Sequence, residues 1–302
     1  MKLLFLNQYV LKAVMPYKKE HLLLSEFSGR VQAIAVNQQD QEVFASIPSQ
    51  GVIMKVKIDG LMTDTPKKND SKILIPHLVG VGRVTSMAFD WVTKNLYFVC
   101  KDANKVHVCS SKLFCTDLLE VKNNIISGLE IDPLAGRLFI SSYSETFLDG
   151  RHNGEILTYS LDGNAVPGIS NRISGHRSSE PVGLTVDIHK KTVMWIDKLT
   201  NIVYSSDYNG KNVAHVVLLT SYQTSLTNFE NTLFLINPQT KKVLNYNLKI
   251  LNSKPTFLQN VPEHSHSILA LQDLMQPQIV DPCSRSQCSH LCLLSAGLIC
   301  FM

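Results

Sequence analysis

Residues 183–197 read GLTVDIHKKTVMWID: a short apolar strand, an aspartate, a polar turn and a second apolar strand. The same parts recur as SMAFD at 86–90 and as GLEID at 128–132, each followed by a second apolar run. In all three copies an apolar residue lies eight positions after the aspartate. Weaker copies lie at 33–45 and, with a shortened turn, at 225–237. A repeat of this kind predicts an array of similar structural units.

Each unit contains the parts of an antiparallel hairpin. Asp90, Asp132 and Asp187 lie where the first strand meets the turn, and Asp132 is followed by Pro-Leu-Ala-Gly. Aspartate accepts hydrogen bonds from backbone N–H groups two residues on, and glycine tolerates the positive φ of a tight turn. We therefore interpret the three aspartates as structural residues that stabilise the turns of the repeat.

A third strand follows the hairpin in each unit. At 53–58 and 156–161 apolar and polar residues alternate, as in a half-exposed strand. These strands end in Asp-Gly, and the corresponding strand of another unit ends in Asn-Gly at 209–210. Both dipeptides are strong hairpin signals. Every unit is thus predicted to hold three or four antiparallel strands, which is the composition of a propeller blade.

The two ends of the chain carry strand-like segments of their own, at 3–14 and at 267–271. We expect them to combine into a sixth blade, because a ring closed by both termini has no open sheet edges at the closure. The predicted fold is all-β, a six-bladed β-propeller over residues 1–279. Its repeats are expected at approximately 29–78, 79–122, 123–178, 179–220 and 221–260, with the sixth blade shared by 1–28 and 261–279.

The second strands of three units carry a family resemblance. The segments LYFV at 96–99, VMWID at 193–197 and LFLIN at 233–237 are similar to degenerate copies of the Tyr-Trp-Thr-Asp repeat. That repeat characterises the class B propeller of the LDL receptor family, and the resemblance covers almost the whole chain. It implies a six-bladed propeller that is followed directly by an EGF-like module.

Four cysteines lie close together near the C-terminus: Cys283, Cys288, Cys292 and Cys300. Their spacing resembles the start of an EGF-like module. Such a module has six cysteines, so the resemblance implies a truncated copy over residues 280–302. By that similarity Cys283 pairs with Cys292, and Cys288 pairs with Cys300. Short cysteine-rich modules belong to oxidising compartments. The alternative is a cluster of free thiols or a metal site.

The other three cysteines lie in a single repeat. Cys109 and Cys115 flank a short polar turn, and a local disulfide that closes this turn is one expectation. Cys100 ends an apolar strand. We interpret it as a buried thiol, because free cysteine behaves as a small hydrophobic residue.

The chain has 302 residues, of which 44% are hydrophobic, and a formal net charge of +4. This composition suffices for a large core and is ordinary for one all-β domain. Its lysine pairs fall mainly in predicted turns, so they are interpreted as solvated surface, and no nucleic-acid partner is expected. The apolar start at 3–6 is too short for a secretory signal and is interpreted as a strand. No window approaches the length of a membrane span.

One glycosylation sequon, Asn69-Asp70-Ser71, follows a polar stretch between two units. A surface loop of this kind accepts a glycan when the protein is secreted. Asn69 is therefore a candidate glycosylation site in a predicted loop.

The sequence offers little for catalysis. It contains no Gly-x-Ser-x-Gly nucleophile turn and no His-Glu-x-x-His metal helix. The enzymatic alternative is a calcium-dependent propeller hydrolase, which needs Asp, Glu and Asn side chains that converge on the axis. The strands that would face the axis are apolar or small, with Glu130 as their only acidic member. We therefore expect no enzyme, no cofactor, and no catalytic or metal-binding residue.

The resemblance implies an extracellular binding segment of a single-pass endocytic receptor, located at the cell surface and in endosomes, whose membrane anchor is absent from this chain. The implied partners are lipoprotein or yolk-protein cargo, or the receptor's own ligand-binding repeats. The propeller would act in ligand release, recycling or partner docking. The alternative is a matrix or growth-factor-precursor protein with the same order of propeller and EGF-like module.

Overall fold

The computed structural model describes most of the chain. The described residues are 1–15, 20–61, 63, 67–75, 83–100, 104–145, 152–177, 179–221, 223, 225–237, 239–250, 253–260, 265–271, 275–280, 282–285, 288, 291–294 and 298–301. The regular elements within them are β-strands, apart from short 3-10 turns such as η1 (Pro48–Gln50) and η4 (Pro282–Arg285). The predicted all-β class is confirmed.

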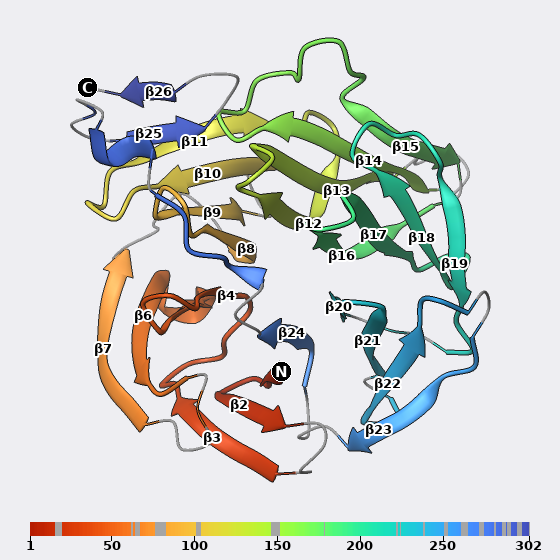
Figure 1. The fold of residues 1–302 in the computed structure, drawn as a ribbon, viewed down its shortest axis with the longest axis horizontal. Helices are drawn as coiled ribbons and strands as arrows, with labels where there is room; N and C mark the ends of the chain where they lie inside the picture. The colour runs from red at the N-terminus through yellow and green to blue at the C-terminus, as the bar shows by residue number, and fades with distance from the viewer. Residues whose placement is uncertain are drawn as a thin grey trace.

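Six four-stranded antiparallel sheets form the blades of a six-bladed β-propeller around a central axis (Figure 1). Blade 1 contains β4 (Ile34–Asn37), β5 (Glu42–Ile47), β6 (Val52–Asp59) and β7 (Lys67–Ile75). Blade 2 contains β8 (Val84–Asp90), β9 (Asn95–Cys100), β10 (Lys105–Cys109) and β11 (Cys115–Glu120). Blade 3 contains β12 (Ile125–Asp132), β13 (Arg137–Glu145), β14 (His152–Ser160) and β15 (Arg172–Arg177).

The remaining blades follow the same plan, with the first-named strand at the axis. Blade 4 contains β16 (Pro181–Asp187), β17 (Thr192–Asp197), β18 (Ile202–Asp207) and β19 (Ala214–Leu218). Blade 5 contains β20 (Ser225–Phe229), β21 (Thr232–Asn237), β22 (Lys242–Asn247) and β23 (Thr256–Asn260). Blade 6 combines β24 (Ser267–Leu271) with β1 (Lys2–Leu6), β2 (Val10–Met15) and β3 (Glu20–Glu26).

Blade 6 closes the ring by pairing the two ends of the propeller. β24 runs antiparallel to β1, from Lys2 opposite Leu271 to Leu6 opposite Ser267. β1 therefore lies between β24 and β2, and the N-terminus lies beside β24 (Figure 1). Both edges of β1 are satisfied by backbone hydrogen bonds, as expected where a ring removes open edges.

Short hydroxyl side chains join the innermost strands of neighbouring blades. Ser86 Oγ in β8 accepts the Leu129 N–H of β12 at 3.1 Å, and Ser127 Oγ in β12 donates to the Pro181 carbonyl of β16 at 2.5 Å. Similar bonds join β16 to β20 and β20 to β24. Because buried backbone groups need partners, serine and threonine suit the centre of the ring better than purely apolar residues.

The hydrophobic core lies between the faces of adjacent blades. Phe98 and Trp195 are each 2% exposed and Ile140 is 0% exposed. These are the residues eight positions after the repeat aspartates, so the repeat marks one core position in each of blades 2, 3 and 4. Burying a side chain of this size contributes about 1.5–3 kcal/mol.

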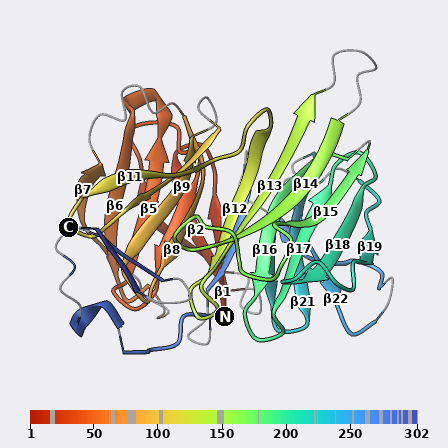
Figure 2. The ribbon, with the colours of Figure 1, turned by 90° about the horizontal axis from the view of Figure 1, so that it is seen from above.

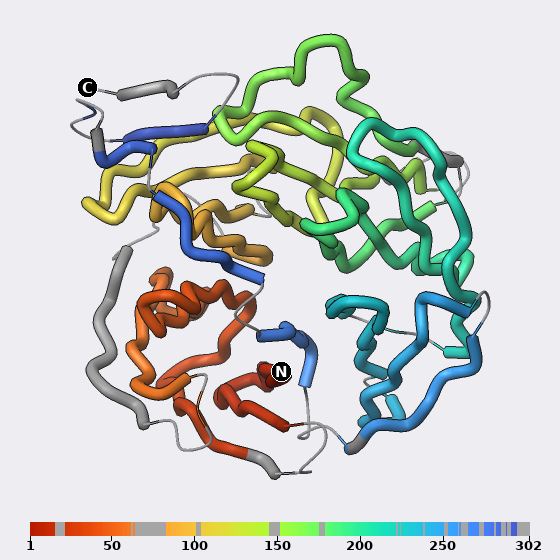
Figure 3. Tube along the Cα trace, in the orientation of Figure 1, coloured from red at the N-terminus to blue at the C-terminus, as the bar shows by residue number. Residues whose placement is uncertain are grey.

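The C-terminal segment leaves the ring on one face. From the side, η4 lies beyond the ends of the blades (Figure 2). The linker at 275–280 starts near the centre of the ring and runs outward toward blade 2 (Figure 3). β25 (Leu291–Leu294) and β26 (Leu298–Phe301) then form a separate two-stranded sheet.

Candidate functional site

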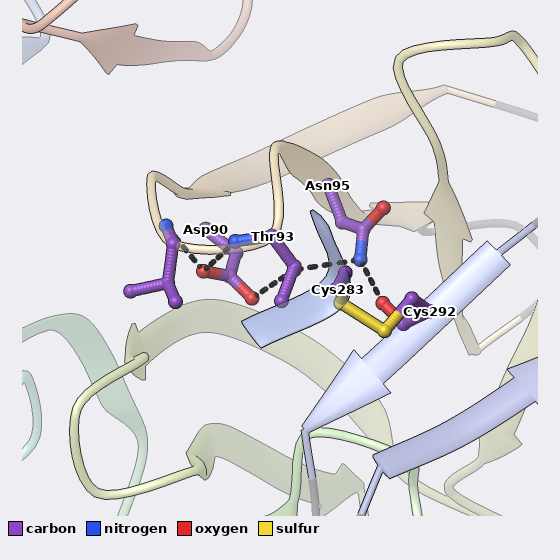
Figure 4. The surroundings of a disulfide bond; sticks show 6 residues. Asp90, Thr93, Asn95, Cys283 and Cys292 are labelled. Atoms are coloured by element: carbon purple, nitrogen blue, oxygen red, sulfur yellow. Dashed lines mark hydrogen bonds between the residues drawn. A yellow bond between two sulfur atoms is a disulfide. The ribbon is translucent and has the colours of Figure 1, made fainter. Parts of the chain in front are cut away.

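The three turn aspartates lie at the ends of innermost strands and accept hydrogen bonds from their own turns. Asp90 Oδ1 accepts the N–H groups of Val92 at 2.9 Å and of Thr93 at 3.1 Å, and its Oδ2 accepts the Thr93 hydroxyl at 2.5 Å (Figure 4). Asp132 and Asp187 accept equivalent bonds from N–H groups two or three residues on. The three carboxylates hold turns together, and none of them lines the axial cavity described below.

Asp132 also connects two blades. Its Oδ2 accepts the Tyr208 hydroxyl at 2.9 Å and the Lys191 ammonium at 2.8 Å, and both donors belong to blade 4. Asp132 is 0% exposed. Burial, reinforced by the Asp132 carboxylate, raises the pKa of Tyr208 well above its usual value. A buried carboxylate needs such donors, because an unpaired one is strongly destabilising. The three side chains therefore anchor blade 3 to blade 4.

A cavity of about 340 Å³ follows the propeller axis. The innermost strands of all six blades line it, together with Gln32 near one end and Trp91 near the other. Among the described residues, Glu130 of β12 is the one acidic side chain that lines this cavity. Burial raises the pKa of Glu130 to about 8, and a hydrogen bond from the Ile131 N–H opposes part of that rise. The protonated form of the Glu130 carboxyl is therefore favoured at pH 7.

The linker crosses one mouth of the axial cavity and is fixed there by an amide side chain. Gln276 Oε1 accepts the Gln38 N–H at 2.7 Å, and Gln276 Nε2 donates to the Val36 carbonyl at 2.7 Å. Gln39 Nε2 donates to the Pro277 carbonyl at 3.2 Å. Gln276 also lines the cavity. These bonds hold the linker against the end of β4 and cover the mouth on that side.

The segment after the linker is docked onto the propeller. A disulfide joins Cys283 to Cys292, and Asn95 Nδ2 donates to the Cys292 carbonyl at 2.7 Å (Figure 4). Leu291 and Leu293 are 1% and 0% exposed and belong to the core cluster between blades 2 and 3. Apolar burial and a directed hydrogen bond thus fix this segment beside blade 2.

Asn95→Ala is expected to loosen the docked segment. The change removes the donor of a buried carbonyl, and an unsatisfied buried group costs about 1–3 kcal/mol. Hydrogen exchange of the amides at 291–294 is expected to accelerate about tenfold or more, as mass spectrometry can measure. Asn212→Ala, at an exposed turn, is the matched control. Equal protection in the two variants would contradict the role given to Asn95.

The remaining cysteines divide into bonded and buried positions. Cys109 and Cys115 lie opposite each other on β10 and β11 and form a disulfide. Cys100 is 0% exposed within the core between blades. Cys288 is also disulfide-bonded, and the side chain of Cys300 lies outside the described residues. The disulfides exclude the alternative of a free-thiol cluster, and the described residues contain no group of three His, Cys, Asp or Glu that could hold a metal.

Asn69 was expected in a loop, and that expectation was wrong. The structure places it in β7, the outermost strand of blade 1. The register between β6 and β7 shifts between Val56 and Ile58, so Asn69 and Asp70 lie in a bulge opposite Lys57. The polar composition of this stretch favours a loop, but backbone pairing with β6 determines its conformation. The side chain of Asn69 lies outside the described residues.

Sequence reasoning missed two lysines that bind a neighbouring blade: Lys191 belongs to a lysine pair that was interpreted as solvated surface, and Lys94 was not considered. Lys191 binds Asp132 of blade 3, and Lys94 Nζ lies 3.0 Å from Asp40 Oδ2 of blade 1. Each lysine follows its own turn aspartate by four residues and has a positive φ, 54° and 60° respectively. In blades 2 and 4, a lysine four positions after the turn aspartate thus bonds to the preceding blade, and this spacing can be recognised in the sequence.

The chain is similar to known proteins in both sequence and fold. No family model matches the chain. It is 25% identical over 221 residues to the vitellogenin receptor of Solenopsis invicta, which covers 72% of this chain and 12% of that protein. It is 25% identical over 220 residues to the vitellogenin receptor Yl of Drosophila melanogaster, which covers 72% of this chain and 10% of that protein. A chain in the crystal structure of a nidogen/laminin complex has a TM-score of 0.70 and 17% identity, over 89% of this chain and 97% of that chain.

The chain is a β-propeller that resembles those of the LDL receptor family. It spans about a tenth of the length of the two receptors that it matches. Within the part of this propeller that the structure describes, no helix is both long and apolar enough to traverse a bilayer.

Proposed function

We propose that this propeller is an extracellular binding segment of an endocytic receptor for yolk-protein or lipoprotein cargo, acting in ligand release, recycling or partner docking. The observation that carries the proposal is the similarity to two vitellogenin receptors over 72% of the chain. Both names describe receptors of a yolk protein, so the partner class proposed here is protein.

Two structural features support a secreted binding scaffold. The disulfides at Cys109–Cys115 and Cys283–Cys292 fit an oxidising compartment. Among the described residues one carboxyl group lines the axial cavity, whereas a calcium-dependent hydrolase needs several oxygen ligands that converge on one ion. We therefore propose binding without catalysis, at the cell surface and in endosomes.

The docked C-terminal segment supports a structural role for a following module. We propose that residues 280–302 begin an EGF-like module, with Cys288 paired to Cys300. Its anchoring by Asn95 and by two buried leucines holds the start of that module at a fixed orientation to the propeller. An interface of this kind lets a receptor position its neighbouring domains without a flexible hinge.

The proposal is tested with the whole 302-residue chain, secreted with its disulfides formed and immobilised on a biosensor. The analytes are purified vitellogenin, a lipoprotein particle, and an isolated array of class A ligand-binding repeats, each at neutral and endosomal pH. Saturable binding of any of the three, absent from an unrelated six-bladed propeller, supports the proposal. Binding of a laminin module alone would favour the matrix alternative, and calcium-dependent lactone hydrolysis would favour the enzyme.

A further inference from the structure

The axial cavity is lined from one end of the innermost strands to the other. Its lining extends from the starts of the innermost strands, near Gln32 and Thr85, to their ends, near Trp91. Gln276 and its hydrogen bonds to Gln38 and Val36 cover the end near Trp91. A volume of about 340 Å³ lies at the lower end of the range of small-ligand sites. A cavity of this volume has room for a small organic group.

Among the described residues, Glu130 is the one acidic side chain that lines this cavity, and His266, near the start of β24, is the one histidine. The third residue of the repeat is Ala35, Ala88 or Thr185 in three other blades, and Glu130 in blade 3. Among the described residues, no side chain forms a hydrogen bond or ion pair with the Glu130 carboxyl, which receives only the Ile131 N–H. A desolvated carboxyl without a cationic partner favours the protonated form, and an incoming cation reverses that preference.

The lining also contains polar atoms at each of its two ends. Gln38 Oε1 and Thr85 Oγ1 line the cavity and have no hydrogen-bond partner among the described residues. A divalent metal prefers six or more oxygen ligands with several carboxylates, and one glutamate does not supply them. An alkylammonium ion has one charge and three N–H donors, and its methylene groups can pack against apolar lining residues such as Leu184.

We propose that the axial cavity binds a primary ammonium group on an unbranched alkyl arm, with the Glu130 carboxylate as its counter-ion. On binding at pH 7, protonated Glu130 releases its proton to solvent and the ammonium keeps all of its own, so one proton leaves for each ion pair formed. The arm enters at the Gln32 side, since the linker covers the other mouth. The same chemistry is carried by a free alkylamine and by a lysine side chain of another protein.

Calorimetry on the full chain tests the site with two probes: n-butylamine for the free amine, and Nα-acetyl-lysine methylamide for the lysine side chain. Saturable binding at pH 7 is expected, with release of close to one proton. This release is read from the difference in heat between phosphate and HEPES buffers. Binding by n-butylamine alone assigns a free-amine site, and binding by the capped lysine assigns a protein side chain. n-Butanol, which has the same shape without the charge, is expected not to bind.

The variant Glu130→Gln is expected to weaken binding about tenfold or more, because the charge-assisted hydrogen bond is lost while the side-chain volume is kept. Glu120→Gln, at an exposed position on β11, is the matched control and is expected to bind as the unaltered protein does. No binding of either probe, equal affinity in Glu130→Gln, or binding without proton release would each overturn the proposal. None of these results bears on cargo binding, which is measured separately.

Discussion

Glu130→Gln is expected to stabilise the propeller, with a gain that grows as the pH rises. The pKa of Glu130 is about 8 in the folded protein and 4.5 in an unperturbed glutamate. Because the folded-state value is the higher one, this group contributes its full stability below pH 4.5 and loses it progressively as the pH rises through 8. The full shift corresponds to at most roughly 5 kcal/mol once the carboxyl is ionised, and less to the extent that the partly exposed Glu130 side chain is solvated. Glutamine does not titrate and avoids this loss.

Urea denaturation at pH 4, 6 and 9, without added amine, measures the effect. The two proteins are expected to have similar free energies of unfolding at pH 4, and the variant is expected to exceed the parent by several kcal/mol at pH 9. Glu120→Gln removes a carboxyl from an exposed strand position and controls for the change in net charge. A pH-independent difference between Glu130→Gln and the parent would contradict the placement of this carboxyl in a desolvated cavity.

Asp132→Ala is expected to destabilise the propeller by about 3 kcal/mol or more. The change leaves the Tyr208 hydroxyl and the Lys191 ammonium without their shared acceptor, and breaking a buried pair by removing one partner costs about 3–5 kcal/mol. Asp187→Ala is the matched control. It removes equivalent turn hydrogen bonds and has no buried tyrosine partner, so a loss of about 1–2 kcal/mol is expected.

A double-mutant cycle separates the inter-blade bond from the turn bond. Asp132→Asn keeps an oxygen for the turn, and Tyr208→Phe removes only the hydroxyl. Because the two side chains touch, a coupling of about 1 kcal/mol or more between the changes is expected from urea denaturation. Additive effects, or losses no larger in Asp132→Ala than in Asp187→Ala, would show that the link between blades 3 and 4 contributes nothing beyond the turns.

The sequence sufficed for the fold, because the signals of a propeller are local. Apolar alternation, turn aspartates and Asp-Gly dipeptides each act within a few residues, and their repetition predicted six blades. The closure of the ring by both termini could also be predicted, since strand-like segments remained at both ends after five units were assigned. The apolar residue eight positions after each repeat aspartate, Trp195 among them, is buried in the structure.

The site was harder to predict, because its contacts join residues that are far apart in the chain. Glu130 was recognised as the only acidic residue of its strand set, but its desolvation depends on five other blades. The hydrogen bonds between Gln276 of the linker and the end of β4 join residues about 240 positions apart, and no sequence motif marks them. The polar stretch around Asn69 was misassigned for the same reason, since only its pairing partner β6 makes it a strand.

The pairing of β1 with β24 also fixes the order in which the molecule can be made. Leu4 lies opposite Leu269, a separation of 265 residues, so β1 is synthesised well before the strand that pairs with it. Contacts so distant in sequence slow folding, and the nascent blades must wait with unpaired edges. A chain interrupted before β24 would leave one edge of β1 unpaired, and such an edge favours aggregation.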